Sequence, residues 1–507
     1  MRHLCFAHTK AFTLLFLLLS ISLSSTSLAQ DNNAGDTGVV VKQALQPVAQ
    51  ADLDQLKSTL DSLATQGDLA KTRVGIHVLD LQTGQVLYEH DSSSLYNPAS
   101  NMKMVTSALA LDLFGPAYTF STTISAPKQK GDIINGNIYL SGTGEGFILY
   151  EDVLDWAATI KNKGITSITG DVIVSDGLFK QGAYLPPGFE QKQEDASYRA
   201  PIGAVSVNFN ATSITIAPGA KAGDKPIITL DPPNDYIDIQ SDLTTVSGKT
   251  RRLNVQSITS EDGNGTIIKI SGKIGTSASA WSTRKRIDSP PLYAGSVFKH
   301  ALEDLGIKVN GTVKRGDVPK DTHTLVSHGS EPLTELIMAM NKWSNNFMAE
   351  QLFRAIGTHE KAGEQRGTWE GSTAVMNTFL SSLGFKEGTD YTLKNGSGLY
   401  AGNGLTPKTI TTLLAFMYNH TWSVEYISSM AIGGVDGTLA KRFKSSKGMF
   451  RGKTGTLNEV SALSGFVTTK GGRKLAVSII LNNPPIYAWR LRSEQDKIAQ
   501  AIIDFEK

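Results

Sequence analysis

The sequence predicts a mixed α/β fold, in which a main domain with an antiparallel sheet flanked by helices carries β-rich inserted domains. Two short β-prone runs near the start, 74–79 and 86–89, flank a Gln-Thr-Gly turn and indicate a hairpin. Near the end, β-prone runs at 462–468 and 475–481 precede a helical pattern over 488–505. The middle third holds many short β-prone runs broken by Gly, Pro and Asn. If the hairpin pairs with the late strands, the two chain ends build one sheet around an insertion.

The expected helices are marked by apolar residues at helical spacing. Residues 51–64 carry four leucines at such spacing, which indicates an amphipathic helix. Another helix is expected to begin at Pro98, because proline is tolerated in the first turn of a helix. Further helical patterns cover residues 293–305, 333–356, 373–383 and 409–418.

A chain of 507 residues exceeds one ordinary hydrophobic core, so several domains are expected. We assign residues 30–120 and 315–507 to the main domain and residues 121–314 to the β-rich inserted region. Two inserted domains are expected, one over about 121–215 with 288–314 and the other over about 216–287. The β-prone runs of this region lie at 133–140, 171–174, 213–217, 227–230 and 266–270.

The first 29 residues are typical of a secretory signal peptide. Basic residues precede a short apolar run, 11–19, and the small residues Ser27 and Ala29 place the cleavage before Gln30. An uncleaved anchor is the alternative, but the run is shorter than the roughly 20 residues of a membrane span. No later segment is long and apolar enough to span. We therefore expect a protein secreted across the inner membrane, periplasmic or in the cell envelope, with no stable membrane span in the mature chain.

Composition argues against several classes of function. The 49 basic and 47 acidic residues nearly balance, which gives no reason to expect a nucleic-acid partner. Cys5 is the only cysteine and lies in the predicted leader, so disulfides, thiolate catalysis and cysteine-bound metals are not expected in the mature chain. The histidines from His77 to His420 show no ligand-like spacing, so no metal or other cofactor is expected.

Three short motifs occur in an informative order along the chain. They are Ser100-Asn101-Met102-Lys103, Ser344-Asn345-Asn346 and Lys453-Thr454-Gly455. Together they match the S-x-x-K, S-x-N and K-T-G set of serine enzymes that recognise penicillin. Pro98 places Ser100 near a helix N-terminus, and a spacing of three residues puts Lys103 on the same face. The β-prone residues around K-T-G predict an edge strand that lines a cleft.

Each motif alone is weak evidence, and two of the three recur elsewhere in the chain, whereas K-T-G occurs once. S-x-x-K also begins at Ser125, Ser282 and Ser296. We expect Ser125 and Ser282 at the surface, whereas Ser296 falls inside an amphipathic helix and not at its end. S-x-N recurs at 206–208, where alternating apolar residues over 205–209 predict a strand. Ser100 alone combines a helix start with the downstream partners.

The motifs, with their spacing, resemble the type-4 penicillin-binding proteins, the D-alanyl-D-alanine carboxypeptidase/endopeptidase family. The long gap between Ser100 and Ser344 resembles the two extra domains that this family inserts between its first two motifs, whereas class A β-lactamases are far shorter. Local sequences similar to the family signatures lie at 198–201, 205–210, 396–399 and 435–439. The resemblance covers nearly all of the mature chain and implies a penicillin-binding transpeptidase-like main domain.

Some positions depart from the family pattern. Residues 142–146 read Gly-Thr-Gly-Glu-Gly where the family commonly has Gly-Asp-Pro, and Asn395 stands where Asp often precedes Gly-Ser-Gly. Tyr400 and Ala401 replace a Ser-Arg pair whose arginine is associated with the peptide side chain in such enzymes. The resemblance therefore leaves the side-chain specificity open.

The resemblance implies a serine acyl-transfer mechanism. Ser100 is the expected nucleophile, Lys103 its base, since burial and a second cation at Lys453 favour the neutral amine, and Ser344 a proton relay. Asn346 is expected to hold a substrate amide, and Lys453, Thr454, Gly455 and Thr456 to bind the substrate carboxylate side of the site. The backbone N–H groups of Ser100 and Thr456 are the expected oxyanion hole.

The expected partners are peptidoglycan stem peptides and β-lactam antibiotics. Carboxypeptidase and endopeptidase activities both cleave after a D-amino acid, and the sequence does not separate them. The alternatives are a β-lactamase, which shares the acylation step, and a non-catalytic penicillin-binding wall protein.

Overall fold

The computed structural model describes residues 46–180, 184–192 and 194–505. The predicted signal peptide and Cys5 lie outside these ranges. The main sheet is antiparallel and has the order β2-β1-β23-β22-β21-β20. Its strands are β1 (Arg73–Asp80), β2 (Val86–His90), β20 (Ala431–Ile432), β21 (Phe450–Leu457), β22 (Val460–Thr468) and β23 (Lys474–Asn482). In the pairing of β1 with β23, Val78 lies opposite Val477. The predicted sheet built from the two chain ends is confirmed.

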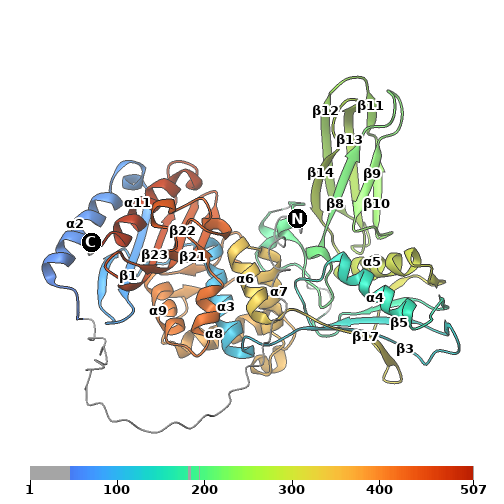
Figure 1. The fold of residues 1–507 in the computed structure, drawn as a ribbon, viewed down its shortest axis with the longest axis horizontal. Coiled ribbons are helices and arrows are strands. Elements are labelled where there is room, and N and C mark those ends of the chain that lie inside the picture. Colours follow the sequence, from blue (N-terminus) through green and yellow to red (C-terminus); the bar gives the residue numbers. More distant parts are fainter. Residues whose placement is uncertain (1–45, 181–183, 193, 506–507) are drawn as a thin grey trace, which may run out of the picture. The chain divides into compact units, whose positions relative to one another are not determined.

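One face of this sheet is covered by the first and last helices of the described chain. Helix α2 (Gln50–Ala64) lies beside α11 (Arg492–Ile503), and both pack on the strands (Figure 1). Leu56 and Leu60 of α2 and Ile498 and Ile502 of α11 are buried there. The leucine spacing predicted this helix, because residues three or four apart share one face.

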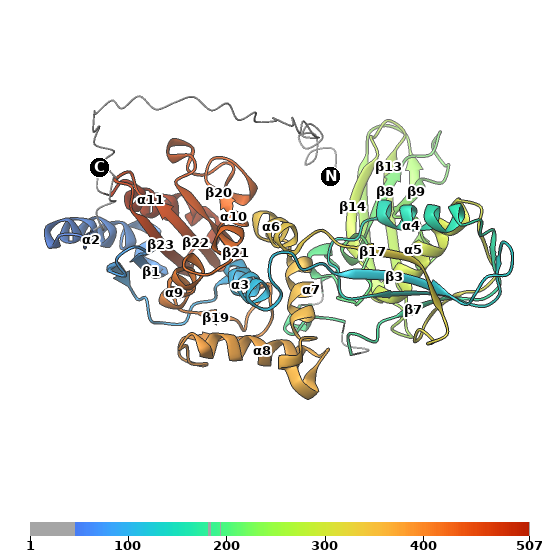
Figure 2. The same cartoon turned by 60° about the horizontal axis from the view of Figure 1, so that its bottom comes forward.

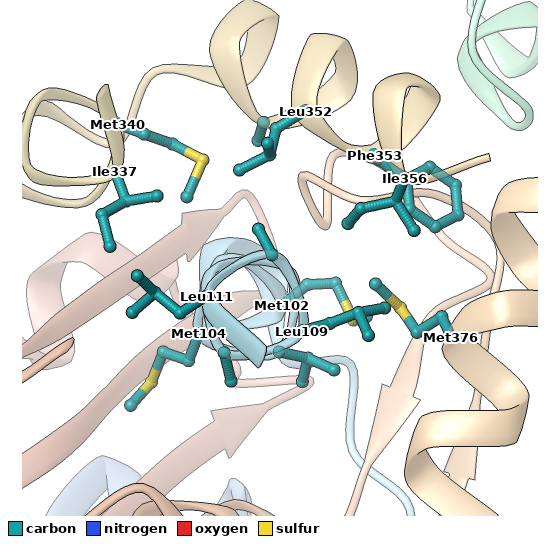
Figure 3. Close-up of a cluster of buried hydrophobic side chains, with 14 of the residues drawn as sticks. Met102, Met104, Leu109, Leu111, Ile337, Met340, Leu352, Phe353, Ile356 and Met376 are labelled. Carbon is teal, nitrogen blue, oxygen red and sulfur yellow. The ribbon is translucent and has the colours of Figure 1, made fainter. Parts of the chain in front are cut away.

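The other face carries helices that surround α3 (Met102–Phe114). These are α6 (Leu333–Trp343), α7 (Asn346–Ile356), α8 (Trp369–Ser382), α9 (Pro407–Tyr418) and α10 (Ser423–Ser428). All ten residues from Met102 to Leu111 are buried, so α3 is a central core helix. Figure 3 shows its side chains meeting those of three neighbours, at Ile337, Met340, Leu352, Phe353, Ile356 and Met376. Such burial on every side makes α3 a rigid platform for the residues that precede it.

The helical pattern over 333–356 is interrupted, which the sequence analysis did not predict. Helix α6 ends at Trp343, and Ser344 adopts a left-handed conformation with φ of 57°. Helix α7 then begins at Asn346, and the side chain of Asn345 caps it by accepting a hydrogen bond from the N–H of Met348 at 3.1 Å. The S-x-N motif therefore lies at a corner between two helices.

The inserted region forms further sheets and has its own core. A five-stranded sheet has the order β16-β7-β5-β3-β17, and β17 (His323–Gly329) runs antiparallel beside β3 (Ser121–Ala126) (Figure 2). Its other strands are β5 (Ile138–Gly142), β7 (Val172–Ser175) and β16 (Val313–Arg315), and a small sheet holds β4 (Ile133–Ile134), β6 (Ser167–Ile168) and β15 (Lys308–Val309). Helices α4 (Tyr150–Asn162) and α5 (Pro290–Asp304) pack together beside these sheets. Because β17 lies beyond residue 314, this sheet extends past the expected end of the insertion.

The remaining strands of the insertion form two smaller sheets. One has the order β14-β8-β9, and the other has β10-β13-β11 with β12 paired to β13. Their bounds are β8 (Ala211–Ala217), β9 (Ile227–Asp231), β10 (Ile237–Ser241), β11 (Thr244–Val246), β12 (Arg251–Thr259), β13 (Thr266–Gly275) and β14 (Trp281–Arg286). The insertion is thus β-rich, although α4 was not predicted. Its division into two domains stays a prediction.

Three local predictions were wrong. The run 133–140 forms β4 and β5 in separate sheets, because Gly136, with φ of 128°, turns the chain between them. Residues 205–209 form no strand; the chain turns through a short 3-10 helix, and Phe209 has a φ of 60°. Ser125, expected at the surface, is buried within β3.

Candidate active site

Ser100 is presented by a strained turn at the start of α3. It lies half-buried in a short 3-10 helix, Ala99–Asn101, directly before α3. Ala99 has a φ of 44°, a conformation that costs a residue with a Cβ about 1 kcal/mol or more. The turn is held because Asn97 Oδ1 accepts a hydrogen bond from the N–H of Ala99 at 2.9 Å. Asn482 of β23 in turn binds both the N–H and the C=O of Asn97. The sheet therefore fixes the position of Ser100.

Lys103 lies one turn along, as its spacing predicted. Its Nζ donates hydrogen bonds to Ser100 Oγ at 3.0 Å, Asn346 Oδ1 at 2.7 Å and the carbonyl oxygen of Ser397 at 2.8 Å. The side chain is fully buried. Burial disfavours the charged amine and lowers the pKa of Lys103 to about 7, although the carboxylate of Glu350 partly opposes this. About half of the Lys103 amines are therefore neutral near pH 7.

Ser344 and Lys453 form the second hydrogen-bonded pair of the site. Lys453 Nζ donates to Ser344 Oγ at 2.8 Å and to the carbonyl oxygen of Thr454 at 2.8 Å. Lys453 is also fully buried, and this burial, together with repulsion from Lys103, places its pKa well below the usual range. The left-handed corner at Ser344 directs this serine toward β21, and Asn346, two residues on, reaches Lys103.

The K-T-G motif lies on β21 where this strand has a neighbour on one side only. β20 pairs with Gly452 and Arg451, so the strand from Lys453 onward pairs with β22 alone. The short β20 is thus the outermost strand of the sheet, and only the K-T-G part of β21 lies at an edge, as predicted. A Cβ at Gly455 would lie 2.8 Å from the carbonyl oxygen of Pro98, so the absence of a side chain lets β21 approach the turn that carries Ser100.

Two hydroxyl groups of this strand have partners that the sequence did not reveal. Thr454 Oγ1 donates to Thr438 Oγ1 at 2.8 Å. The exposed Thr456 accepts a hydrogen bond at Oγ1 from Arg492 Nη2 at 3.1 Å. The guanidinium group of Arg492 therefore lies at the exposed part of β21, next to Thr456, whereas Lys453 on the same strand is buried.

The loop before Tyr400 also contributes to the site. Asn395 Oδ1 accepts hydrogen bonds from the N–H of Gly398 and the Nδ2 of Asn403, both at 2.9 Å. Its amide donates to the carbonyl of Leu399 at 3.1 Å. The residue that departs from the family pattern thus shapes this loop. Tyr400 is buried, and its hydroxyl contacts Glu194 Oε2 at 3.2 Å.

The competing patterns lie elsewhere. Ser282 is exposed on β14, as predicted, and Ser296 is buried inside α5, where its Oγ accepts a hydrogen bond from the N–H of Asp235. Ser206 is buried and bonded to the carbonyl of Gly203. Hence, of all the motif occurrences, those that begin at 100, 344 and 453 come together. Within the described ranges no group of three or more metal-ligating side chains is assembled.

A serine hydroxyl, two buried lysines, a second serine and an asparagine thus converge where α3, the α6–α7 corner and the edge of β21 meet. This arrangement and the surrounding fold define a serine acyl-transfer hydrolase of the penicillin-recognising class. The profile of the D-Ala-D-Ala carboxypeptidase 3 (S13) family matches residues 56–504, and the chain belongs to this family. It is a serine-type D-Ala-D-Ala carboxypeptidase.

Relatives with known names agree with this assignment. The chain is 32% identical to the D-alanyl-D-alanine carboxypeptidase of Actinomadura sp. (strain R39) over 458 residues. The aligned region covers 87% of this chain and 83% of that protein. It is 23% identical to the D-alanyl-D-alanine carboxypeptidase DacB of Haemophilus influenzae, over 81% of this chain and 85% of that protein.

A solved structure shares the fold. The crystal structure of penicillin-binding protein 4 (dacB) from Haemophilus influenzae has a TM-score of 0.74, with 21% identity, and covers 88% of this chain and 99% of that one. The same protein complexed with a β-lactam matches with a TM-score of 0.70 and 21% identity, over 89% and 100% of the two chains. At this identity the likeness establishes the penicillin-binding fold that the sequence predicted.

Proposed function

We propose that Ser100 is the nucleophile of this carboxypeptidase and that Lys103 is its base. The observation that carries the proposal is the set of three acceptors around Lys103 Nζ. Asn346 Oδ1 and the carbonyl of Ser397 can only accept hydrogen bonds. When Lys103 loses a proton, its two remaining N–H groups therefore stay on these oxygens, and the lone pair faces Ser100 Oγ. The neutral amine is then oriented to take the hydroxyl proton.

The reaction would proceed through an acyl-enzyme. Ser100 Oγ attacks the carbonyl carbon of the penultimate D-alanine, and its proton passes to Lys103. The bond to the leaving amine breaks while Ser344 relays a proton from Lys453 to that nitrogen. Water then attacks the ester and gives a proton to Lys453 through Ser344, and Ser100 Oγ leaves with the proton that Lys103 returns to it. The N–H groups of Ser100 and Thr456 are the proposed oxyanion hole, since alternate N–H groups of an edge strand have no strand partner.

The substrate would lie along β21. In this proposal Asn346 holds a substrate amide, Gly455 leaves room for the peptide, and Thr454 and Thr456 bind its terminal carboxylate. Lys453 would not contact the substrate directly, because its side chain is fully buried and already hydrogen-bonded to Ser344. In this proposal Lys453 supports the hydrogen bond of Ser344 and adds positive electrostatic potential to the site. The hydroxyls of Thr454 and Thr456 make the direct contacts to the substrate carboxylate.

The proposed substrates are stem peptides of bacterial peptidoglycan ending in D-Ala-D-Ala, with cross-linked peptides as the alternative for a DD-endopeptidase. β-Lactams are the proposed inhibitors; the similar Haemophilus influenzae protein has been solved with one. The proposed location is the periplasm or cell envelope, which the leader sequence supports. No helix in the described ranges has both the length and the apolar character needed to cross a bilayer.

A labelling experiment tests the proposed nucleophile. The wild-type protein should be labelled covalently by a fluorescent penicillin, whereas Ser100→Ala should not, and Ser296→Ala is the control because it removes another motif serine. Labelling of Ser100→Ala would refute the assignment.

Incubation with purified peptidoglycan fragments and mass analysis then distinguishes the activities. Loss of one D-alanine indicates carboxypeptidase activity, and scission of a cross-link indicates endopeptidase activity. Rapid penicillin hydrolysis without release of D-alanine would favour a β-lactamase, and a single acylation without peptide hydrolysis would favour a non-catalytic binding protein.

A further inference from the structure

Glu350 is a buried carboxylate beside the proposed base that no sequence motif singles out. It lies on α7 and is fully buried. Its Oε1 accepts a hydrogen bond from the N–H of Ser397 at 2.7 Å, and its Oε2 accepts one from the N–H of Gly396 at 3.2 Å. A buried carboxylate is costly unless its oxygens are satisfied, and here two successive backbone N–H groups satisfy them. The carboxylate of Glu350 thus binds the backbone of Gly396 and Ser397 through both of its oxygens.

That piece of backbone leads directly to Lys103. The carbonyl of Ser397, whose N–H binds Glu350, accepts the hydrogen bond from Lys103 Nζ at 2.8 Å. The carbonyl of Gly396 accepts a hydrogen bond from Thr106 Oγ1 on α3 at 2.7 Å. The loop is therefore held between α7 on one side and α3 on the other.

The loop lies tightly against α7 and against the turn that precedes α3. A Cβ at Gly396 would lie 2.4 Å from the Cβ of Phe353 on α7. A Cβ at Gly398 would lie 1.8 Å from the carbonyl oxygen of Ala99. Because the loop is closely packed at these two points, loss of its hydrogen bonds to Glu350 would change the position of the Ser397 carbonyl.

Helix α7 supplies a second acceptor to the same amine. Asn346, which binds Lys103 at 2.7 Å, lies four residues before Glu350, so the two side chains share one face of α7. Two of the three acceptors around Nζ are therefore set by a single helix, one directly through Asn346 and the other through Glu350 and the loop.

We propose that Glu350 is a positioning residue for the acylation reaction, which holds the Gly396–Ser397 backbone so that the Ser397 carbonyl orients the Nζ of Lys103 toward Ser100. The inference rests on the proposed role of Lys103 as the base. Glu350 does not touch the reacting atoms. It acts through the backbone that it binds.

The charge of Glu350 also affects the pKa of Lys103, which can be measured from the pH dependence of acylation. Besides burial, one titratable group shifts the pKa of Lys103, which is Glu350 on α7. Lys103 in turn lowers the pKa of Lys453 on β21. When it is ionised, Glu350 raises the pKa of Lys103 against the larger, opposite effect of burial. Burial also raises the pKa of Glu350 itself to about 7, so this carboxylate carries its full charge only above neutral pH. Loss of that charge would therefore lower the pKa of Lys103 further. A weaker hydrogen bond from the displaced Ser397 carbonyl would shift it in the same direction, because that bond favours the charged amine.

The decisive variant is Glu350→Gln, compared with wild type over a range of pH. It keeps one oxygen acceptor but turns an NH₂ group toward a backbone N–H, so one of the two hydrogen bonds is lost. We expect acylation by a fluorescent penicillin to slow by about 10- to 100-fold, by analogy with the loss of outer groups that orient ligands. We also expect the acidic limb of the rate profile to move to lower pH.

The matched control is Glu145→Gln, a buried glutamate in the inserted region that faces His328 at 3.4 Å. It should lower stability without moving the acidic limb. A Glu350→Gln protein with the wild-type rate and the wild-type acidic limb would overturn the inference. The inference would also be overturned if Glu350→Gln only reduced the fraction of folded protein, while the folded molecules kept the wild-type rate and pH profile.

If Glu350→Gln does not fold, Glu350→Asp tests the same proposal. It keeps the charge but withdraws the carboxylate by one methylene, so the rate should fall while the acidic limb stays near its wild-type position. A wild-type rate in this variant would overturn the positioning role. Labelling of Ser100→Ala in the same assay would instead refute the proposed nucleophile, whatever the Glu350 variants do.

Discussion

The Cα of Gly398 lies against the carbonyl of Ala99, so close that a Cβ there would meet its oxygen at 1.8 Å. Gly398 also has a φ of 76°, a conformation that side-chain-bearing residues rarely adopt. Since Ala99 precedes Ser100 and is itself strained, the loop and the turn before α3 constrain each other. The Gly-Ser-Gly sequence is therefore required by sterics at the active site.

We expect Gly398→Ala to impair acylation severely. The backbone oxygen cannot rotate away from the new methyl group, so the turn carrying Ser100 must shift, and a shift of about 1 Å can cost roughly 100-fold in rate. The rate of labelling by a fluorescent penicillin measures this. Gly384→Ala is the matched control, since Gly384 has a φ of 86° with nothing near its missing Cβ. Equal effects of the two variants would argue against the proposed contact.

The two asparagines of the S-x-N motif should separate stability from activity. Asn345 caps α7, and loss of such a cap costs about 1 kcal/mol of stability, so Asn345→Ala should lower the denaturation midpoint. Asn346 binds Lys103, so Asn346→Ala should reduce kcat/KM for a D-Ala-D-Ala peptide by at least about 10-fold, which corresponds to one lost hydrogen bond to a charged group. The reverse pattern would contradict the assigned roles.

The rate of acylation should rise with pH across neutrality. The base must be unprotonated, and Lys103 has a pKa of about 7 because it is buried. Below this value the amine is charged and the rate falls; above it the rate levels off. Acylation rates between pH 5 and 9, with protein stability monitored in parallel, should show half of the maximum near pH 7. A rate that still rises steeply at pH 9, as an exposed lysine with a pKa near 10.4 would give, would contradict a base with the lowered pKa of Lys103.

The sequence alone predicted the elements that follow local rules. The leucine-rich α2 was predicted from its periodicity, since it has one face on the core. The strands β1, β22 and β23, which are buried on both sides, were predicted as short β-prone runs. The motifs of Ser100, Lys103 and Lys453 stood out because their chemistry restricts both residue type and spacing. The structure brings Lys103 to Ser100 and Lys453 to Ser344, and their roles stay a proposal.

The parts that were missed depend on tertiary contacts. No Gly or Pro marks the corner at Ser344, so the helical pattern over 333–356 reads as continuous, and only packing against β21 explains the left-handed serine. Glu350 reads as one more polar residue of an amphipathic helix, because its partners are backbone N–H groups more than 40 residues away. The sequence analysis expected burial and the charge of Lys453 to lower the pKa of Lys103. Burial is the main cause in the structure, and the opposing charge of Glu350 was not predicted.

Arg492 should contribute to recognition of a free C-terminal carboxylate. Lys453 is fully buried, whereas the exposed guanidinium of Arg492 binds Thr456 Oγ1 at the open end of β21. An exposed ionic contact contributes about 0.2 to 1 kcal/mol, so Arg492→Ala should raise KM about two- to five-fold for a peptide ending in a free carboxylate. The same peptide with a C-terminal amide should be unaffected. Arg490→Ala is the control, because Arg490 is exposed nearby in the chain but lies over the ring of Trp489. If both arginine variants, or both peptides, respond equally, the effect is one of general surface charge, and the hydroxyls of Thr454 and Thr456 must hold the carboxylate without Arg492.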